Sequence, residues 1–341
     1  MTNLKLKIKV AFVEGLKDVV LKEIKQYPKL HIISENKDSL LLDFTQDFSS
    51  ILNLKSVTRA YLVSQDSKYN PSYISKHKSI LSNIINTVID KNKDKFKSFK
   101  ITCAGGDSTE VRNISEYIQA EHKLVEKEEA DIKIHIVKLK DTWEVGAQMT
   151  SRPLSLRDYK VEHMSGAMDP TIAYAVNSLC RLGDKSSYLN IFSGSATLLI
   201  EAGLIYPNLK PMVGFDNNKK HISLAIQNIK KAGLIKRIQL NEKNIFDKPN
   251  LGKFDVITSD LPFGMVISKN ENLEDLYQCF IDYCEETLNG SGILVVYTSE
   301  HQILEKIILK SKFEIIETLE LKFITKVDAY LKPKIFMCRF R

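Results

Sequence analysis

The chain has 341 residues, of which 43% are hydrophobic and 27% charged, a composition that fits an ordinary globular protein and excludes a collagenous or disordered chain. A chain of this length is expected to form two or three domains. No apolar run is long enough to span a bilayer, and the amino terminus lacks the apolar stretch and cleavage site of a signal peptide, so we expect a cytoplasmic protein without a membrane partner.

The positive charge is concentrated in the first half of the chain. Residues 1–160 hold 27 Lys and Arg against 21 Asp and Glu, whereas residues 161–341 hold 22 against 21. A basic surface attracts polyanions and gives sequence-independent affinity for phosphates. Lysine-rich faces also serve solubility, so the charge alone leaves nucleic-acid binding and simple solvation open.

Cysteine and histidine give no sign of a metal site. The five cysteines come as an odd number without a C-x-x-C pair, and the seven histidines show no H-E-x-x-H spacing. We therefore expect neither a disulfide framework nor a bound metal.

The first 150 residues predict small α/β units, because strand-like and helix-like periods interleave twice. The expected elements are a strand over 4–13, a helix over 14–24, strands over 30–34 and 40–44, a helix over 75–89, a strand over 99–103, a helix over 111–127, and strands over 132–139 and 143–149. The domains predicted from this pattern are 1–65 and 66–150. Residues 151–168 have no clear period and are interpreted as a linker.

From residue 169 the chain alternates strand and helix, which is typical of a parallel doubly wound sheet. The expected elements are helices over 170–182, 197–205, 219–232, 273–288 and 302–309, and strands over 188–192, 212–215, 237–240, 254–259 and 292–297. Two further strand-like runs, 313–323 and 334–340, could form an antiparallel hairpin at one sheet edge. Residues 169–341 are therefore predicted to be one α/β domain.

Ligands of open α/β sheets bind beyond the carboxyl ends of the strands, so the turns after the strands are the candidate sites. After the first strand, Gly194 permits close backbone approach, Ser195 and Thr197 supply hydroxyls, and the next helix offers free N–H groups. Asp216 ends the second strand about 20 residues later, where an acid can bind ribose hydroxyls. The loop departs from G-x-G-x-x-G, which disfavours a nicotinamide or flavin cofactor.

The turn after the fourth strand carries the most specific chemistry. Asp260 offers a carboxylate acceptor, Pro262 stiffens the backbone, and Phe263 offers a flat face for stacking. These groups suit a flat heterocycle with an exocyclic amine, whose hydrogens would go to Asp260 and to the backbone carbonyl of Leu261 or Pro262. The amine lone pair would then face a methyl donor. The alternative is that Asp-Leu-Pro-Phe-Gly is only a tight turn.

These segments resemble known methyltransferases. The run Asp260 to Gly264 is similar to the fourth motif of amino-group methyltransferases, and Phe192 to Thr197 resembles their first motif. The run from Gly214 to Gly233 resembles the second motif and helix of RNA methyltransferases that carry a THUMP domain. The entry from Arg152 to Tyr159 and the run from Met168 to Ala173 resemble the linker and lead-in helix of those enzymes.

Within that group the chain is most similar to the tRNA guanosine-N2 methyltransferases, over about residues 150–300 and more loosely over 1–150. The resemblance implies a Rossmann-like methyltransferase domain with an antiparallel hairpin edge, preceded by small ferredoxin-like and THUMP domains. It implies S-adenosyl-L-methionine as cofactor and structured RNA, most of all tRNA, as partner of a monomer. It implies these cofactor contacts: Thr171, Phe192, Ser193, Gly194, Ser195, Ala196, Thr197, Asp216, Asn217, Asn244 and Ile245. The implied catalytic residues are Asp260, Leu261, Pro262 and Phe263.

The chain departs from the family pattern at three positions, two in the first motif and one directly after the fourth. Asn190 stands where an aspartate is common, Ala196 replaces a second glycine, and Met265 replaces a frequent basic residue. Because an alanine does not easily adopt positive φ, we expect a tighter or shifted pocket near Ala196. The alternatives are guanosine-N2 methylation of large-subunit rRNA, N6-adenine methylation of nucleic acid, and a non-catalytic RNA-binding protein with a degenerate cofactor site.

Overall fold

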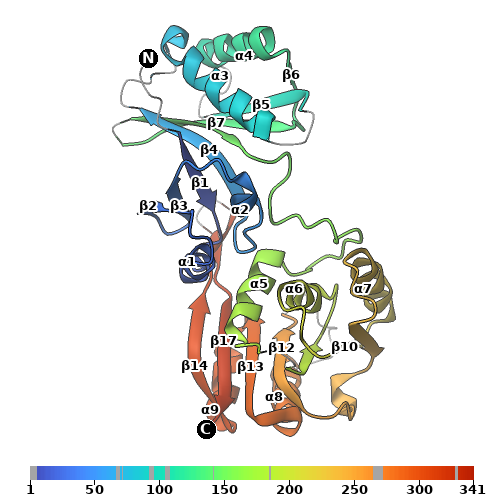
Figure 1. The fold of residues 1–341 in the computed structure, drawn as a ribbon. Coiled ribbons are helices and arrows are strands. Elements are labelled where there is room, and N and C mark those ends of the chain that lie inside the picture. Colours follow the sequence, from blue (N-terminus) through green and yellow to red (C-terminus); the bar gives the residue numbers. More distant parts are fainter. Residues whose placement is uncertain are drawn as a thin grey trace. The chain divides into compact units, whose positions relative to one another are not determined.

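The computed structural model of the chain describes residues 6–66, 70, 72–91, 96–103, 108–140, 142–183, 186–263, 272–326 and 329–341 (Figure 1). Gly264 and Met265 therefore lie outside the described residues. The chain divides into two compact units. The N-terminal unit comprises Met1–Phe12 and Val20–Ser155, and the C-terminal unit comprises Val13–Val19 and Leu156–Arg341. Among the described residues, no helix is long and apolar enough to cross a membrane.

The N-terminal unit is built on one eight-stranded sheet in the order β2-β3-β1-β4-β8-β7-β5-β6. Its strands are β1 (Lys7–Ala11), β2 (Ile32–Glu35), β3 (Ser39–Asp43), β4 (Arg59–Asp66), β5 (Ser98–Cys103), β6 (Val125–Glu126), β7 (Ile132–Lys138) and β8 (Trp143–Gln148). Its helices are α1 (Lys17–Ile24, which continues from the C-terminal unit), α2 (Phe48–Leu52), α3 (Ile74–Lys91) and α4 (Thr109–His122). Figure 1 shows α3 and α4 side by side on one face of this sheet.

β4 joins the two halves of this sheet. Arg59 to Val63 of β4 pair antiparallel with β1, and Tyr61 to Asp66 pair antiparallel with β8. The domain boundary predicted between residues 65 and 66 thus falls at the last residue of a strand that pairs with both segments.

The predictions for this unit missed α2 and β4, and the predicted helix 111–127 was too long. α4 ends at His122 because Lys123 takes a left-handed conformation, with φ of 54°. The following residues form β6, whose parallel pairing with β5 overrides the continuing helical period. Tertiary pairing of this kind is not visible in a local sequence pattern.

The C-terminal unit contains a seven-stranded sheet in the order β11-β10-β9-β12-β13-β17-β14. Its strands are β9 (Tyr188–Ile191), β10 (Met212–Asp216), β11 (Ile238–Glu242), β12 (Phe254–Asp260), β13 (Leu288–Thr298), β14 (Phe313–Glu320) and β17 (Lys334–Phe340). The first five are mutually parallel, with β9 at the point where the strand order reverses. This confirms the predicted doubly wound Rossmann-like fold.

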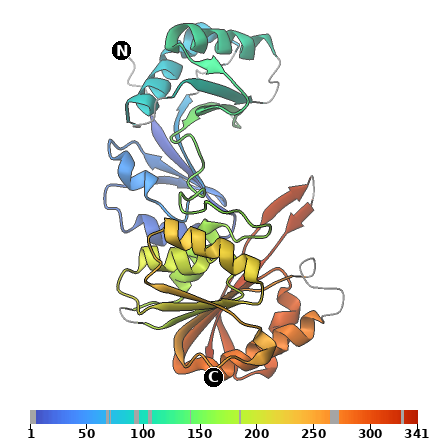
Figure 2. The same ribbon diagram turned by 90° about the vertical axis from the view of Figure 1, so that its right-hand side faces the viewer.

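Helices cover both faces of this sheet, as Figure 2 shows. They are α5 (Pro170–Leu179), α6 (Thr197–Ile205) and α7 (Lys219–Lys231) on one face, and α8 (Leu273–Thr287) and α9 (His301–Lys310) on the other. The core between β9, β12, β13 and α8 is apolar, with Leu189, Ile257 and Phe280 fully buried. A sheet covered on both faces explains why its central strands are nearly continuous apolar runs.

The predicted antiparallel hairpin edge is confirmed. β17 pairs antiparallel with both β13 and β14 and lies between them. The predicted strand 313–323 is interrupted, because β14 ends at Glu320. The chain then forms a separate two-stranded ribbon of β15 (Phe323–Lys326) and β16 (Ala329–Leu331).

The segment between the two sheets is fixed to α6 by a buried carboxylate. Glu201 is 1% exposed, and its Oε1 accepts hydrogen bonds from the Tyr159 hydroxyl at 2.7 Å and from Arg157 Nε at 3.1 Å. The Lys160 ammonium donates to the carbonyl of Met168 at 3.0 Å. Residues 157–168 are therefore held against the C-terminal sheet, and they position the lead-in to α5.

Candidate functional site

The predicted site residues lie at the carboxyl ends of β9, β10 and β12. β9 pairs with β10 on one side and with β12 on the other. The helices that follow β9 and β10 cover one face of the sheet, whereas α8, which follows β12, covers the other face. In open α/β sheets this reversal opens a crevice at the strand ends, and ligands bind there.

The loop after β9 alternates backbone handedness. Phe192, Gly194 and Ala196 have φ of 56°, 48° and 61°, whereas the two serines between them keep negative φ. The amides of Ser193, Gly194 and Ala196 point into the fold, where they donate to the Phe215 carbonyl, to Asp216 Oδ2 and to the Ser193 carbonyl. Ala196 thus adopts the positive φ that we expected alanine to avoid. It does so as the N-cap of α6, where its amide donates to the Ser193 carbonyl at 2.7 Å.

Asp216 ties this loop to the end of β10. Its side chain is 7% exposed, and its Oδ2 accepts from the Gly194 amide at 2.9 Å. Its Oδ1 accepts from the Asn218 amide at 2.9 Å and lies 3.4 Å from His221 Nδ1. A carboxylate can accept about four hydrogen bonds, so Asp216 retains acceptor capacity toward the cavity.

The turn after β12 is anchored on both sides of Asp260. The Leu261 side chain is fully buried, and its amide donates to the Tyr297 carbonyl of β13 at 3.0 Å. The carbonyl of Pro262 accepts from the Tyr277 hydroxyl at 3.0 Å, and that hydroxyl also lies 2.8 Å from Thr298 Oγ1. The turn therefore cannot rotate Asp260 away without breaking core contacts.

Asp260 carries an unsatisfied buried oxygen. Its Oδ1 has no hydrogen-bond partner among the described residues and is shielded from solvent. Burial raises the pKa of the Asp260 carboxyl to about 7, because the charged form is poorly solvated there. A carboxyl with such a pKa, placed in a cleft, is a candidate for function.

Asn190 presents a second orphaned oxygen nearby. Its Nδ2 donates to the Thr258 carbonyl at 3.1 Å, which fixes the amide so that Oδ1 points away from that carbonyl. Asn190 is 1% exposed, and its Oδ1 has no partner among the described residues. Both orphaned acceptors call for a ligand that donates hydrogen bonds.

Two adjoining cavities collect most of the predicted residues. A cavity of about 190 Å³ is lined by Phe192, Gly194, Asp216, Asn217, Asn244, Ile245, Asp260, Leu261, Pro262 and Phe263. A cavity of about 40 Å³ is lined by Asn190, Phe192, Ser193, Gly194, Ser195, Thr197 and Asp260. Asp260 lines both, so it lies where the two spaces meet.

Two predicted cofactor residues line neither cavity. Thr171 is fully buried, and its hydroxyl and amide donate to Asp169, the N-cap of α5, at 2.6 and 2.7 Å. Ala196 is fully buried beneath the loop. These two residues lie behind the residues that line the cavities, and their contact with the cofactor stays a prediction.

Sequence reasoning missed several lining residues. They are Met164, Ser165, Gly166, His221, Lys243, Phe246 and Leu276. The segment 164–166 comes from the aperiodic linker, which offered no pattern to interpret. His221 follows Asp216 by five residues, and its place on the first turn of α7 was the available signal.

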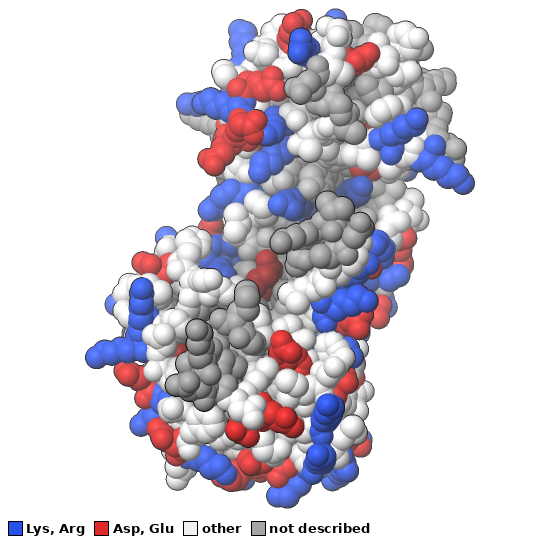
Figure 3. Space-filling view, turned by 180° about the vertical axis from the view of Figure 1, so that it is seen from behind, with Lys and Arg blue, Asp and Glu red and all other residues white. Residues whose placement is uncertain are grey.

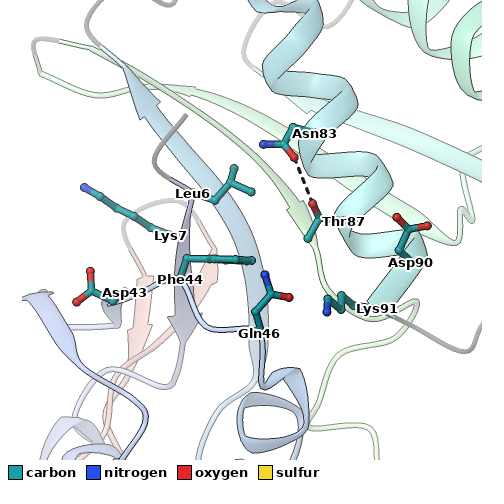
Figure 4. A pocket seen from close by; sticks show the side chains of 9 residues that line it. All are labelled: Leu6, Lys7, Asp43, Phe44, Gln46, Asn83, Thr87, Asp90 and Lys91. Carbon is teal, nitrogen blue, oxygen red and sulfur yellow. Dashed lines mark hydrogen bonds between the residues drawn. The ribbon is translucent and has the colours of Figure 1, made fainter. Parts of the chain in front are cut away.

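The N-terminal unit contains two larger polar cavities. One, of about 620 Å³, lies between α3 and the strand ends of β1 and β3, with Phe44 pointing into it and Lys7 and Lys91 at its sides (Figure 4). The other, of about 510 Å³, is lined by Lys9, Arg59, Lys133 and His135, among others. On the face that Figure 3 shows, basic side chains form several separate groups interspersed with acidic ones.

A buried carboxylate organises the second of these cavities. Glu144 is 1% exposed and accepts from Lys9 Nζ at 2.9 Å and from Gln65 Nε2 at 2.8 Å, and His135 Nε2 lies 2.9 Å from it. The cavity wall is therefore preorganised by a hydrogen-bonded network across four strands, β1, β4, β7 and β8.

Comparison with known proteins finds methyltransferases. Residues 157–325 match the family described as RMKL-like, methyltransferase domain. The chain is 24% identical over 239 residues to a tRNA (guanine(6)-N2)-methyltransferase of Methanocaldococcus jannaschii, covering 58% of this chain and 62% of that protein. It is 30% identical over 157 residues to the mouse U6 snRNA (guanine-N(2))-methyltransferase THUMPD2, covering 46% of this chain and 28% of that protein. The chain thus spans less than two thirds of the length of these relatives.

The crystal structure of TrmN from Thermus thermophilus has the same fold, with a TM-score of 0.80, 18% identity, and coverage of 98% of this chain and 100% of that chain. The C-terminal unit therefore has the Rossmann-like fold of a methyltransferase domain, and the likeness in fold also covers the residues of the N-terminal unit.

We predict that Asp260 makes the stability of the ligand-free protein depend on pH. An acid whose pKa is about 7 when folded and about 3.9 when unfolded destabilises the fold increasingly as pH rises from about 4 to about 7. Asp260→Asn should therefore raise the midpoint of urea unfolding relative to the parent at pH 8, and this advantage should shrink toward pH 4.5.

Asp255 of the same strand provides the matched control. Hydrogen bonds from the Ser187 amide and hydroxyl hold the pKa of Asp255 below its usual value, so its contribution has the opposite sign. Asp255→Asn should lower stability to a similar extent from pH 6 to pH 8. A pH-independent difference between Asp260→Asn and the parent would show that Asp260 ionises normally.

Proposed function

We propose that this protein transfers a methyl group from S-adenosyl-L-methionine to the exocyclic N2 amine of a guanosine in tRNA. The observation that carries the proposal is the orphaned Oδ1 of Asp260, buried where two cavities meet and followed by Phe263. The match to a methyltransferase domain and the relatives named as guanine-N2 methyltransferases support the reaction class.

The residues around the cavities fit this cofactor. The orphaned Oδ1 of Asn190 is a neutral acceptor for the amino group of the methionine moiety. Because the amides of Ser193, Gly194 and Ala196 are bonded within the fold, we assign the carboxylate of that moiety to the N–H groups at the start of α6. Asp216 and Asn217 are placed for the ribose hydroxyls, and Asn244 and Ile245 for the adenine. When bound, the cofactor supplies an electrophilic methyl carbon on a sulfonium.

The turn 260–263 is placed to hold the acceptor base. Phe263 lines the larger cavity and offers its ring to a base extruded from the RNA. Asp260 accepts one amine hydrogen through Oδ1. Because Pro262 already binds the Tyr277 hydroxyl, we assign the other amine hydrogen to the carbonyl of Leu261.

Asp260 also has a role once the guanine N2 amine begins to attack the methyl carbon. The guanine N2 lone pair is delocalised into the ring, so the nitrogen must pyramidalise and becomes positive as the new carbon–nitrogen bond forms. A carboxylate at Oδ1 stabilises that charge and then takes the proton that the amine loses. A pKa near 7 suits this proton transfer, because proton acceptors work best when their pKa lies near the working pH.

RNA binding belongs to the N-terminal unit in this proposal. Residues 1–65 and 66–150 are proposed to be a small ferredoxin-like domain and a THUMP domain, with 151–168 as linker and 169–341 as the catalytic domain of a monomer. The excess of basic residues in 1–160 supports phosphate binding, and so do Lys9, Arg59 and Lys133 around one cavity. Structured RNA is recognised largely by shape and backbone contacts.

Within this proposal, the first prediction distinguishes tRNA from the competing substrates, large-subunit rRNA and adenine in nucleic acid. Incubated with isotopically labelled cofactor, the protein should methylate unmodified bulk tRNA, and nucleoside analysis should find N2-methylguanosine. Label in large-subunit rRNA alone, or N6-methyladenosine in any polymer, would replace this substrate with one of the alternatives. Binding of the cofactor without any transfer would indicate a non-catalytic RNA-binding protein.

The second prediction concerns the cofactor. Asp216→Ala should weaken cofactor binding by roughly 1.5 to 3 kcal/mol, the range for hydrogen bonds to a charged group, as measured by calorimetry. Asp247→Ala is the matched control, because Asp247 is exposed and lines neither cavity. An unchanged dissociation constant for Asp216→Ala would remove Asp216 from the cofactor site. Asp216 also accepts hydrogen bonds from the amides of Gly194 and Asn218, so its loss could destabilise the fold. Unfolding curves recorded without cofactor check that the weaker binding does not come from such destabilisation.

The third prediction divides the roles of Asp260 and Phe263. Asp260→Ala should lower the single-turnover rate at saturating RNA by orders of magnitude while cofactor affinity stays nearly intact. Phe263→Ala should mainly raise the RNA concentration needed for half-maximal rate, because stacking contributes about 1 to 3 kcal/mol per base. Near-normal single-turnover methylation by Asp260→Ala would exclude this turn as the active site.

A further inference from the structure

The β15–β16 ribbon has no role in the site described so far. Its two strands pair only with each other among the described residues, outside the seven-stranded sheet. Figure 2 shows them extending beyond that sheet as a projection of the C-terminal unit. An isolated two-stranded ribbon is marginally stable by itself, so its persistence here needs support at its base.

The topology places the ribbon at the same sheet edge as Asp260. β17 is antiparallel to both β13 and β14, so β14 runs in the direction of β13 and ends at the carboxyl edge. Asp260 of β12 pairs with Tyr297 of β13. The next residue, Thr298, pairs with Lys334 of β17, and Lys334 pairs with Glu320 of β14. With neighbouring strands about 4.8 Å apart, the ribbon begins about 15 Å from the end of β12.

The base of the ribbon is held firmly. The Leu321 side chain is fully buried, and its amide donates to the Pro333 carbonyl at 2.9 Å. The Lys322 amide donates to the Glu14 carbonyl at 3.0 Å, which joins residues 13–19 to the ribbon within the C-terminal unit. Gly15 has φ of 104° and lies close to the backbone of Glu320. A Cβ at position 15 would clash with the carbonyl oxygen of Glu320.

The ribbon exposes an apolar and aromatic face. Ile324 pairs directly with Tyr330, so their side chains lie on one face, and they are 79% and 49% exposed. The Lys322 ammonium lies 4.0 Å from the centre of the Tyr330 ring, which puts a cation on the same face. A rigidly held projection with apolar side chains in water is typical of a contact surface.

Charge indicates which partner this face suits. Residues 321–334 contain four lysines, Lys322, Lys326, Lys332 and Lys334, and one acid, Asp328. Lys334 is paired with Glu305 at 3.0 Å at the base, and Lys332 is exposed. An aromatic side chain flanked by cations matches a nucleic-acid strand, whose bases stack on rings while its phosphates meet lysines. A protein partner would not need the cationic excess.

We propose that the β15–β16 ribbon is a second RNA-docking element, which stacks an unpaired base on Tyr330 and Ile324 and binds a phosphate through Lys332. It holds RNA near the reacting base, because the ribbon begins about 15 Å from the end of β12. The inference rests on the proposed function, since it assumes that the substrate is RNA.

The test uses the full chain carrying Ile324→Ser together with Tyr330→Ala, and bulk tRNA as the probe. RNA affinity should fall roughly tenfold, with cofactor affinity and the unfolding midpoint unchanged, because the ribbon lies outside the cofactor cavities. Leu309→Ser is the matched control, because Leu309 is 68% exposed but lies on α9, just before the start of β14 at the opposite sheet edge. This control should bind RNA like the parent.

Lys332→Gln separates an RNA contact from a structural effect. It should reduce the slope of log affinity against log salt by about one, as expected for one lost phosphate contact. RNA affinity within twofold of the parent for the double variant, or an unchanged salt slope for Lys332→Gln, would overturn the proposal. So would loss of self-association in the double variant, seen by sedimentation, with RNA binding intact.

The failure of this inference can be told apart from failure of the proposed function. If the parent methylates tRNA and the double variant does so with the same KM for RNA, only the ribbon proposal fails. If the parent transfers no methyl group to any RNA, the proposed function fails.

Discussion

The buried Oδ1 of Asp260, which has no hydrogen-bond partner among the described residues, is the constraint on which the site depends. A buried carboxyl without a hydrogen-bond donor is costly, and most proteins avoid it by turning the group toward solvent. Here the turn is fixed by Leu261 in the core and by the Tyr277 hydroxyl on Pro262. The fold thus holds this acceptor at the two cavities that Asp260 lines, where a ligand amine can donate to it.

Asn190 complements this arrangement. Asn190 and Asp260 both line the smaller cavity, and an aspartate at position 190 would place a second carboxylate beside the first. Two carboxylates that close together raise the pKa of one of them further and favour a protonated Asp260, which cannot take the proton that the amine loses. The amide keeps an acceptor oxygen without adding charge. The departure at residue 190 is therefore compatible with a working Asp260 and does not by itself indicate a degenerate site.

Much of the C-terminal unit could be predicted because its signals are local. The helix 197–205 was predicted with the bounds that α6 has, and the turns after β9, β10 and β12 were located from strand ends alone. The failures are tertiary in origin. Ala196 reaches positive φ because the loop between β9 and α6 demands it.

Other features depend on partners far away in the sequence. Residues 13–19 belong with the C-terminal unit through Glu14 and Lys322, some 300 residues apart in the chain, which no local period could reveal. The lining segment 164–166 comes from a linker without periodicity, and its place follows from Glu201 holding Arg157 and Tyr159. Contacts of this kind need the folded chain.

The antiparallel strand β17 explains why the sheet can offer two different contacts at one edge. In a purely parallel sheet, each strand leaves the carboxyl edge through a loop into a helix, as β9, β10 and β12 do here, and those loops surround the cavity. Reversing β17 converts the last connection into a hairpin whose turn also lies at the carboxyl edge. A hairpin needs no helix to cover it, so β15 and β16 can extend from the edge while Glu320 and Lys334 at their base pair within the sheet. The reversal of β17 is thus sufficient to place an extended surface beside the cavity. The strands that build the cavity, β9, β10 and β12, remain unaltered.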